Sequence, residues 1–135
     1  WGAGVGIDFT RRDLQIAHRE KGRPWDWGKA FDNSAPISPL IPLADIPNAH
    51  AEFTTGRIWL SVNGELRQDA DLSELIWSVK DIIAFCSQSV SLQAGDLIFT
   101  GTPAGVSAVG PGDSLSGGID GVGEIQITLS KREAV

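Results

Sequence analysis

The sequence is poor in sulfur-containing residues, with one cysteine, Cys86, and no methionine among its 135 residues. A single thiol cannot form a disulfide within the chain, and we expect a reducing compartment and therefore a cytoplasmic protein. No apolar run approaches the roughly 20 residues that a membrane-spanning helix needs. Nothing at the start of the chain has the basic and then apolar pattern of a signal peptide. The sequence therefore predicts neither membrane insertion nor secretion.

Basic residues are also few, with 11 Lys and Arg against 17 Asp and Glu and a formal net charge of −6 at pH 7. A nucleic-acid surface normally shows a basic stripe, so this balance argues against nucleic acid as a partner. The charges are scattered, which favours a role in solubility over recognition of a partner. With 41% hydrophobic residues, the chain is long enough for a domain with a core, and we expect one domain over residues 1–135.

The first residues, from Trp1 to Ile7, have the pattern of a strand interior. Because the chain also lacks an initiator methionine, we expect it to be a fragment of a longer protein or a product of processing. A trimmed tag or a disordered start is the alternative interpretation.

Glycine and proline fall between short apolar runs, with 16 Gly and 7 Pro in all, which is typical of a β-rich domain with tight turns. We expect strands at residues 5–9, 57–62 and 96–100, and the last strands within residues 119–129. The Asn63-Gly64 pair predicts a hairpin turn after the second of these. Residues 37–43 are predicted to form an extended stretch interrupted by proline.

Two helices are expected. The first follows the strand at residues 5–9, with Thr10 as its cap and Asp13 completing a capping box. Gly22 and Pro24 should end it, which leaves residues 22–33 as a loop. The second and clearest helix spans residues 72–87 and is capped by Asp71 with Glu74.

The second helix should carry an apolar stripe at helical spacing, formed by Leu72, Leu75, Ile76, Val79, Ile82, Ile83 and Cys86. On that stripe the cysteine is expected to belong to the core rather than to a reactive site. The predicted fold class is α+β, mostly β with two helices.

Asp8, Arg12 and Gln15 are the first candidates for chemistry. Asp8 ends an apolar strand, which suits a metal ligand or a general base, although a turn or cap aspartate is the better reading of that residue alone. Arg12 and Gln15 share one helical face and could bind a carboxylate and orient a carbonyl or a water. In isolation an ordinary solvated helix face is the better reading of these two residues.

Lys29 and Thr102 are the second pair of candidates. Aromatic residues surround Lys29 in the sequence and could exclude water, so its charge could stabilise an oxyanion; a surface lysine is an equal alternative. Thr102 lies in a Gly-Thr-Pro turn, where its hydroxyl and N–H could bind a carboxylate, and a plain turn is the alternative. The two histidines, His18 and His50, share no spacing with a serine or cysteine nucleophile.

Taken together, five segments in order along nearly the whole chain resemble the fumarylacetoacetate hydrolase family. They are residues 6–15, the pair 22–25 and 28–36, residues 62–68, residues 95–105 and the glycine-rich end. Within the family, the amino-acid sequence of residues 21–32 and 100–106 is most similar to that of fumarylpyruvate hydrolases. The resemblance implies the β-rich roll of that family, assembled as a homodimer.

The resemblance also implies roles for the candidates. Asp8 would be a carboxylate ligand of a divalent metal, Mg²⁺ first, with Mn²⁺ or Ca²⁺ as alternatives. Lys29 would stabilise the enolate oxygen, and Arg12, Gln15 and Thr102 would bind the keto-acid end of the substrate. The implied reaction is metal-dependent hydrolysis of a carbon–carbon bond in a 2,4-diketo acid, with fumarylpyruvate giving fumarate and pyruvate as the leading expectation.

The sequence departs from the family in one respect. It lacks the Glu-x-Glu pair of metal ligands and the water-activating His–Glu pair that members usually carry upstream of the Asp8 motif. One carboxylate holds Mg²⁺ poorly, so we expect an N-terminal segment to supply the missing ligands and the present chain alone to be inactive. Oxaloacetate decarboxylation, isomerisation of diketo acids and a non-catalytic β-rich binding module are the alternative functions.

Overall fold

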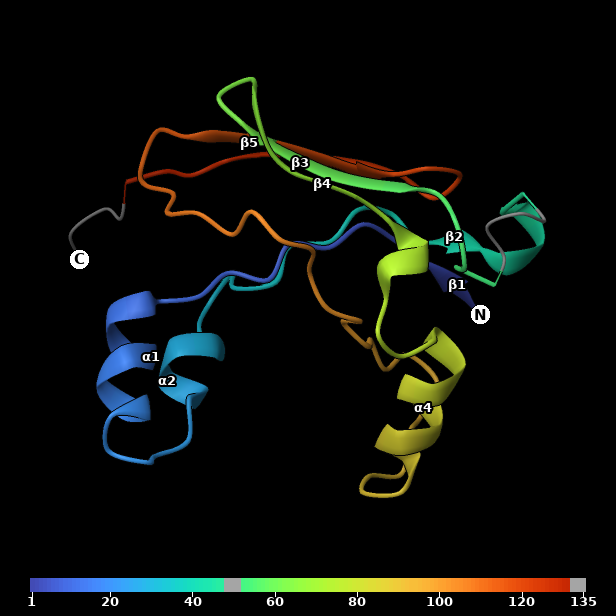
Figure 1. Cartoon of the computed structure of the whole chain (residues 1–135), viewed down its shortest axis with the longest axis horizontal. Helices are drawn as coiled ribbons and strands as arrows, with labels where there is room; N and C mark the ends of the chain where they lie inside the picture. Colours follow the sequence, from blue (N-terminus) through green and yellow to red (C-terminus); the bar gives the residue numbers. More distant parts are fainter. Residues whose placement is uncertain (48–51, 132–135) are drawn as a thin grey trace.

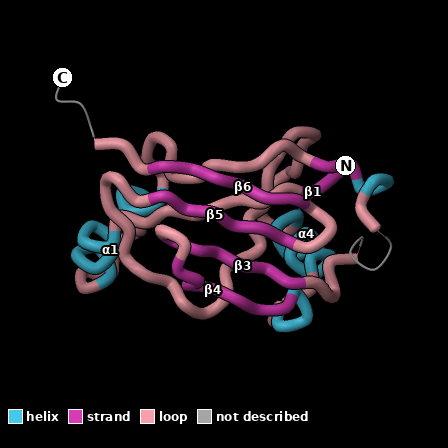
Figure 2. Tube along the Cα trace, turned by 90° about the horizontal axis from the view of Figure 1, so that it is seen from above, coloured by secondary structure: helices cyan, strands magenta, loops and turns pink. Residues whose placement is uncertain are grey.

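The computed structural model describes residues 1–47 and 52–131, and its largest element is a four-stranded antiparallel sheet. The sheet contains β3 (Arg57–Val62), β4 (Glu65–Asp71), β5 (Ser114–Ile119) and β6 (Gly123–Thr128) in the order β4-β3-β5-β6. Figure 1 shows this sheet as one layer with the helices on a single side of it, and Figure 2 shows the four strands side by side from above. The predicted α+β class is confirmed.

The hairpin between β3 and β4 forms where the sequence predicts it. Asn63 and Gly64 both have positive φ, 52° and 80°, as a two-residue type I′ turn requires. The strand expected at residues 57–62 is β3 itself. Ser61 pairs with Leu66 and Leu60 pairs with Gln68, so Arg67 is an extra residue that forms a bulge in β4.

β5 was not predicted as a strand. The last strands were expected within residues 119–129, and β5 ends at Ile119, where that interval begins. Its sequence from Ser114 to Ile119 is rich in serine and glycine, which are poor strand formers in isolation. The glycines serve packing: a Cβ at Gly117 would lie 3.0 Å from the Leu60 side chain, and one at Gly118 would lie 2.7 Å from Nε1 of Trp59. β6 is confirmed within the predicted interval.

The core lies between the sheet and the N-terminal segment at residues 5–9. Its buried apolar residues are Val5, Ile7, Ile46, Val62, Leu115, Val122 and Ile125. Residues 5–9 run antiparallel to residues 34–38, with hydrogen bonds from Ile7 N to Pro36 O (3.0 Å), from Phe9 N to Ser34 O (2.8 Å) and from Ser38 N to Val5 O (2.8 Å). Only the bridge between Gly6 and Ile37 is a regular ladder contact, because proline interrupts the partner segment.

The chain before and after this pairing forms short elements. β1 (Gly2–Ala3) pairs with β2 (Ile41–Pro42), so the expected extended stretch at residues 37–43 is largely confirmed. A turn of 3₁₀ helix, η1 (Leu43–Asp45), follows directly. Figure 1 shows these pieces at the end of the sheet opposite to the first helices.

α1 (Arg12–Arg19) begins one residue later than predicted. Arg11 occupies the cap position and no side chain caps the helix, so the capping box of Thr10 and Asp13 is wrong. The physical reason is that Arg11 N donates to Gly28 O at 2.9 Å, which fixes the chain before the helix without a side-chain cap. The predicted loop at residues 22–33 contains a single helical turn, α2 (Asp26–Lys29).

The predicted helix at residues 72–87 is broken into two. Asp71 and Glu74 form the expected capping box, but they cap only a 3₁₀ turn, η2 (Leu72–Glu74). The chain is extended at Leu75, and α4 (Val79–Ser87) starts after Ser78, whose hydroxyl accepts from Asp81 N at 3.2 Å. This second cap competes with continuation of the first helix.

The expected apolar stripe is retained only in part: Leu72 is buried and Leu75, Val79, Ile82 and Cys86 are half-buried, whereas Ile76 and Ile83 are exposed. Ile76 is 96% exposed, and none of the residues of α4 is buried in the described part of the chain. Cys86 is half-buried rather than a core residue. Within residues 1–47 and 52–131, no helix has the length and apolar character needed to cross a membrane.

The strand predicted at residues 96–100 does not form. This segment follows no neighbouring strand and instead runs beneath the sheet towards residue 109. The Phe99 ring packs on Gly6, where a Cβ would lie 2.6 Å from the ring. The Phe99 side chain therefore contacts the N-terminal segment, whereas Leu97 is 52% exposed.

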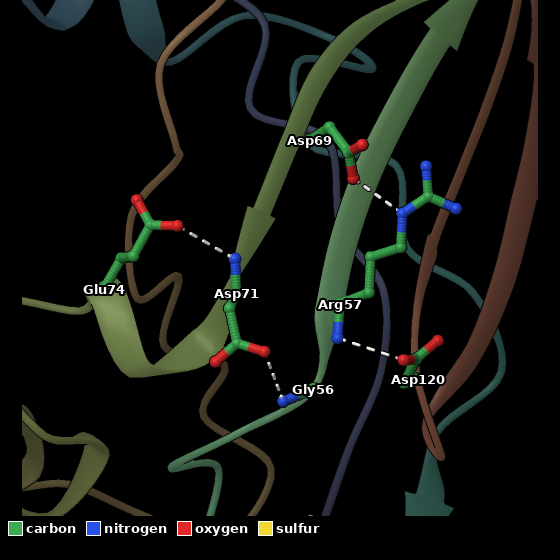
Figure 3. Close-up of polar contacts among 6 residues, drawn as sticks. All are labelled: Gly56, Arg57, Asp69, Asp71, Glu74 and Asp120. Atoms are coloured by element: carbon green, nitrogen blue, oxygen red, sulfur yellow. Dashed lines mark hydrogen bonds and ion pairs between the residues drawn. The ribbon is translucent and has the colours of Figure 1, made fainter.

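Charged side chains fix one end of the sheet, as Figure 3 shows. Arg57 donates from its backbone N to Asp120 (3.0 Å) and from Nε to Asp69 (2.6 Å), while Gly56 N donates to Asp71 (3.1 Å). The hydrogen bond with Arg57 lowers the pKa of Asp69 and raises that of Arg57. These contacts join the start of β3 to the end of β4 and to the turn after β5.

Asp113 ties the other end of the sheet together and should make stability sensitive to acid. Hydrogen bonds from the Asn63 side chain (2.8 Å) and from Gly110 N (2.7 Å) lower its pKa below the ordinary 3.8. A lowered pKa in the folded state means that this stabilisation is present above pH 3.8 and is lost as the pH falls through the lowered value.

We expect Asp113→Asn to reduce the loss of stability between about pH 6 and about pH 3, because this side chain no longer takes up a proton. Thermal unfolding followed by circular dichroism at both pH values measures the loss. Asp45→Asn, at an exposed carboxyl outside the sheet, is the control. An unchanged acid-induced loss in Asp113→Asn would contradict the role given to this carboxylate.

Candidate active site

A cavity of about 690 Å³ lies beneath the sheet and collects all five candidate residues. Asp8, Arg12, Gln15, Lys29 and Thr102 all line it, although they come from three separate parts of the chain. Its remaining wall is largely apolar and includes Ile58, Leu60, Val62, Phe99 and Val106. A mostly apolar cavity with a few convergent polar groups is the usual form of a small-molecule site.

Asp8 and Lys29 are in direct contact. Lys29 Nζ lies 2.8 Å from Asp8 Oδ2, and the two side chains are 37% and 50% exposed respectively. Asp8 follows the buried residues of the N-terminal segment, and Lys29 is the last residue of α2. The pair therefore joins the segment beneath the sheet to the short helix beside it.

Gly28 brings α2 close enough for this contact. It is buried, and a Cβ at this position would lie 3.1 Å from Gln15 N and 3.2 Å from Arg11 O. The Arg11 guanidinium lies 4.3 Å above the Phe31 ring, which holds the chain after α2 against the start of α1. The backbone of α2 can approach α1 only because residue 28 has no side chain.

Arg12 and Gln15 face the cavity from the first turn of α1. Arg12 Nη1 donates to Gln15 Oε1 at 3.0 Å, as their three-residue spacing on a helix allows. Because the carbonyl oxygen of Gln15 accepts from Arg12, its amide NH₂ group is left as a donor. The two side chains together present hydrogen-bond donors to the cavity, which suits an anionic ligand.

Thr102 reaches the cavity from the loop that follows Gly101. Its Oγ1 accepts a hydrogen bond of 2.8 Å from Gln68 Nε2, and Pro103 O accepts a second bond of 2.7 Å from the same nitrogen. Gln68 lies on β4, is 8% exposed and also lines the cavity. The sequence analysis missed Gln68; the available signal was a polar residue at an inward-facing position of a strand.

His18, the histidine that lies within the described residues, does not line the cavity. His18 lies on α1, and its Nδ1 donates to the carbonyl oxygen of Pro24 at 2.8 Å, because a carbonyl can only accept. His50 lies outside the described residues. The placement of His18 gives neither a nucleophile nor a water-activating pair.

The described residues offer little for a metal by themselves. Within residues 1–47 and 52–131, no three side chains of His, Cys, Asp or Glu are grouped closely enough to hold an ion. Asp8 provides a carboxylate in the cavity, which is the donor that a hard divalent cation prefers. The carboxylate of Asp8 fits such a cation in its chemistry and would be one of its ligands.

Comparison with known proteins identifies the family. The model described as fumarylacetoacetate (FAA) hydrolase C-terminal matches residues 1–130. The chain belongs to the fumarylacetoacetate hydrolase family. This confirms the resemblance found in the sequence, and the architecture described above is that of the family.

Three relatives show how near the match is. The fumarylpyruvate hydrolase of a Ralstonia species is 43% identical over 133 residues, which are 98% of this chain and 67% of that protein. The mitochondrial oxaloacetate tautomerase of Rattus norvegicus is 42% identical over 130 residues, 96% of this chain and 57% of that protein. The crystal structure of fumarylpyruvate hydrolase from Pseudomonas aeruginosa, in complex with Mn²⁺ and pyruvate, is 48% identical with a TM-score of 0.91.

That structure matches 98% of this chain and 55% of its own length. The chain thus spans between about half and two thirds of the length of these three relatives. The likeness extends across both the sheet and the loops that line the cavity.

The loop that carries Thr102 is anchored on β4 through Gly105, which gives a test of the site's geometry. Gly105 has a φ of 97°, and a Cβ there would collide with the carbonyl oxygen of Arg67. Gly112 has nearly the same φ, 98°, but open space around it. An alanine at either position strains the backbone because of the positive φ. Only the alanine at position 105 would also clash with a backbone atom, the carbonyl oxygen of Arg67.

We therefore expect Gly105→Ala to lower the free energy of unfolding by about 1–3 kcal/mol more than Gly112→Ala does, as an overpacked site does. Urea unfolding of both variants measures the difference. Equal losses would show that the loop is not held against β4 at this point.

Proposed function

We propose that this chain forms the keto-acid-binding part of a metal-dependent hydrolase of 2,4-diketo acids, with fumarylpyruvate as the substrate. The observation that carries the proposal is the convergence of Asp8, Arg12, Gln15, Lys29 and Thr102 on one cavity from three parts of the chain. The relatives named fumarylpyruvate hydrolase support the substrate. Since the chain covers only part of their length, the activity is proposed for the whole protein.

A divalent cation is part of the proposal, and the Mn²⁺ and pyruvate in the Pseudomonas structure support it. Asp8 would hold the cation, which we expect to be Mg²⁺ or Mn²⁺. One carboxylate is too little for such an ion, so water, substrate and residues outside these 135 would complete the coordination. When bound, the cation would polarise the 2-keto group and reduce the energy of the negative charge that develops there.

Lys29 would stabilise the oxygen on which charge appears as the carbon–carbon bond breaks. Its ammonium group has three donors, so it can keep the bond to Asp8 and still donate to the substrate. A substrate bound against the largely apolar wall of the cavity would displace water from this contact, which would strengthen the interaction. A pyruvate enolate is a better leaving group when the Lys29 ammonium group stabilises its negative charge.

Arg12, Gln15 and Thr102 would hold the carboxylate and the keto group. Arg12 can donate two parallel hydrogen bonds to a carboxylate. The NH₂ group of Gln15 and the hydroxyl of Thr102 add donors on other sides. Fixing the keto acid in this manner places the reacting carbonyl at the apolar part of the cavity.

Oxaloacetate tautomerisation is the second candidate function. The rat tautomerase is 42% identical to this chain, against 43% for the Ralstonia hydrolase, so identity does not separate them. Oxaloacetate also carries a carboxylate beside a 2-keto group, and the same five residues suit it. The two reactions differ in whether a carbon–carbon bond is broken, which a product assay decides.

The first test is the ultraviolet absorbance of fumarylpyruvate in the presence of the full-length protein. We expect rapid loss of absorbance with Mg²⁺ or Mn²⁺, formation of pyruvate, and no loss with a chelator. Enol-to-keto conversion of oxaloacetate by the same sample is the parallel assay. A folded, metal-loaded protein that spares fumarylpyruvate and converts oxaloacetate would replace the first candidate by the second.

Lys29→Ala should separate transition-state stabilisation from binding. Because the Lys29 contact strengthens as charge develops, we expect kcat to fall by about 10²-fold with a smaller change in KM. Lys21→Ala, at an exposed lysine before α2, should leave both constants unchanged. A loss in Lys29→Ala that is confined to KM would exclude the proposed role.

A further inference from the structure

Gln68 is one of two buried polar side chains in the described part of the chain, with Ser38 as the other. It lies on β4 at 8% exposure, whereas its neighbours Arg67 and Asp69 are exposed. A buried amide costs free energy unless its hydrogen bonds are made. The position of Gln68 beside the cavity therefore depends on its partners.

The orientation of the Gln68 amide follows from those partners. The carbonyl oxygen of Pro103 can only accept, so the atom 2.7 Å from it must be the NH₂ nitrogen. The same nitrogen lies 2.8 Å from Thr102 Oγ1, and it donates there as well. Both hydrogens of the amide are used, and both bonds end on one loop.

This arrangement decides the direction of the Thr102 hydroxyl. A hydroxyl has one donor hydrogen and can accept through its oxygen. Because Thr102 Oγ1 already accepts from Gln68, its own hydrogen must be directed to a different acceptor. Thr102 is exposed and lines the cavity, so a ligand bound in the cavity can supply that acceptor.

The backbone of β4 supports the same contact. Arg67 is the extra residue of the bulge, and its carbonyl oxygen lies against Gly105 of the Thr102 loop. Bulges commonly redirect a side chain next to a site. The side chain of Gln68 and the backbone of Arg67 thus fix two points of one loop.

We propose that Gln68 is a positioning residue that fixes the Thr102 hydroxyl as a hydrogen-bond donor to a carboxylate or keto oxygen of the ligand. Gln68 acts through Thr102 and need not touch the ligand. The inference rests on the proposed function for the chemistry of the ligand, a small 2-keto acid.

The experiment measures binding of pyruvate to the full-length protein in the presence of Mn²⁺ by calorimetry, so it does not need turnover. We expect Gln68→Met and Thr102→Val each to weaken binding by about tenfold, since each removes the directed donor. The double variant should be no weaker than either single variant, because both changes remove the same interaction. Gln68→Glu should also lose affinity, since an ionised carboxylate accepts the Thr102 hydrogen itself.

Ser38→Ala is the matched control for a purely structural loss. Its hydroxyl accepts from Val5 N and donates to Pro39 O, both at 3.0 Å, so the variant also removes buried hydrogen bonds. We expect a lower melting temperature and unchanged pyruvate affinity. Additive losses in the double variant, or native affinity in the Gln68 variants, would overturn the proposal.

If the Gln68 variants fail to fold, the side-chain amide resonances of Gln68 provide the test in the native protein. They should shift when pyruvate and the diamagnetic ion Mg²⁺ are added, and they should not shift in Thr102→Val. No shift in the native protein despite measured pyruvate binding would overturn the inference. If the protein binds pyruvate but does not turn over fumarylpyruvate, the proposed reaction would be wrong, whereas the role of Gln68 would still stand.

Discussion

The site depends on the backbone pairing between residues 5–9 and residues 34–38. Three backbone–backbone hydrogen bonds hold these segments together beneath the sheet, and Val5 and Ile7 are buried in the core beside them. The pairing fixes the two ends of the excursion that contains α1 and α2. Because both ends are fixed, Lys29 returns to Asp8 although 21 residues separate them.

The contact between Lys29 and Asp8 is partly exposed, which suits a site that must accept a ligand. An exposed ion pair contributes about 1 kcal/mol or less to stability, so rearranging it costs little. Buried contacts hold the surrounding framework instead, through the packing of Gly28 on α1 and the hydrogen bonds of Gln68. A rigid support with adaptable charged groups can bind an anion without unfolding the cavity.

The hydrolase and the tautomerase relatives both contain a region that is similar to this chain over nearly all of its length. A hydrolase and a tautomerase are almost equally similar to it, and both names refer to substrates with a 2-keto acid end. The donors on α1 and on the Thr102 loop suit that common end. The distinction between breaking a bond and moving a proton therefore depends on groups around the rest of the substrate.

The sequence by itself determined the features that depend on a few adjacent residues. Asn63-Gly64 set the hairpin because both residues tolerate positive φ, and Asp71 with Glu74 set a cap. The five candidate residues were also selected from the sequence, through motifs that resemble the family. Their gathering in one cavity required the fold.

Only the tertiary structure decided the features that depend on distant contacts. The segment at residues 96–100, expected as a strand, instead packs its Phe99 ring on Gly6 of the N-terminal segment, far away in the sequence. Gln68 could not be recognised for the same reason: its role comes from Thr102, 34 positions away. Local propensity is written in neighbouring residues, whereas hydrogen bonds between distant ones exist only once the chain has folded.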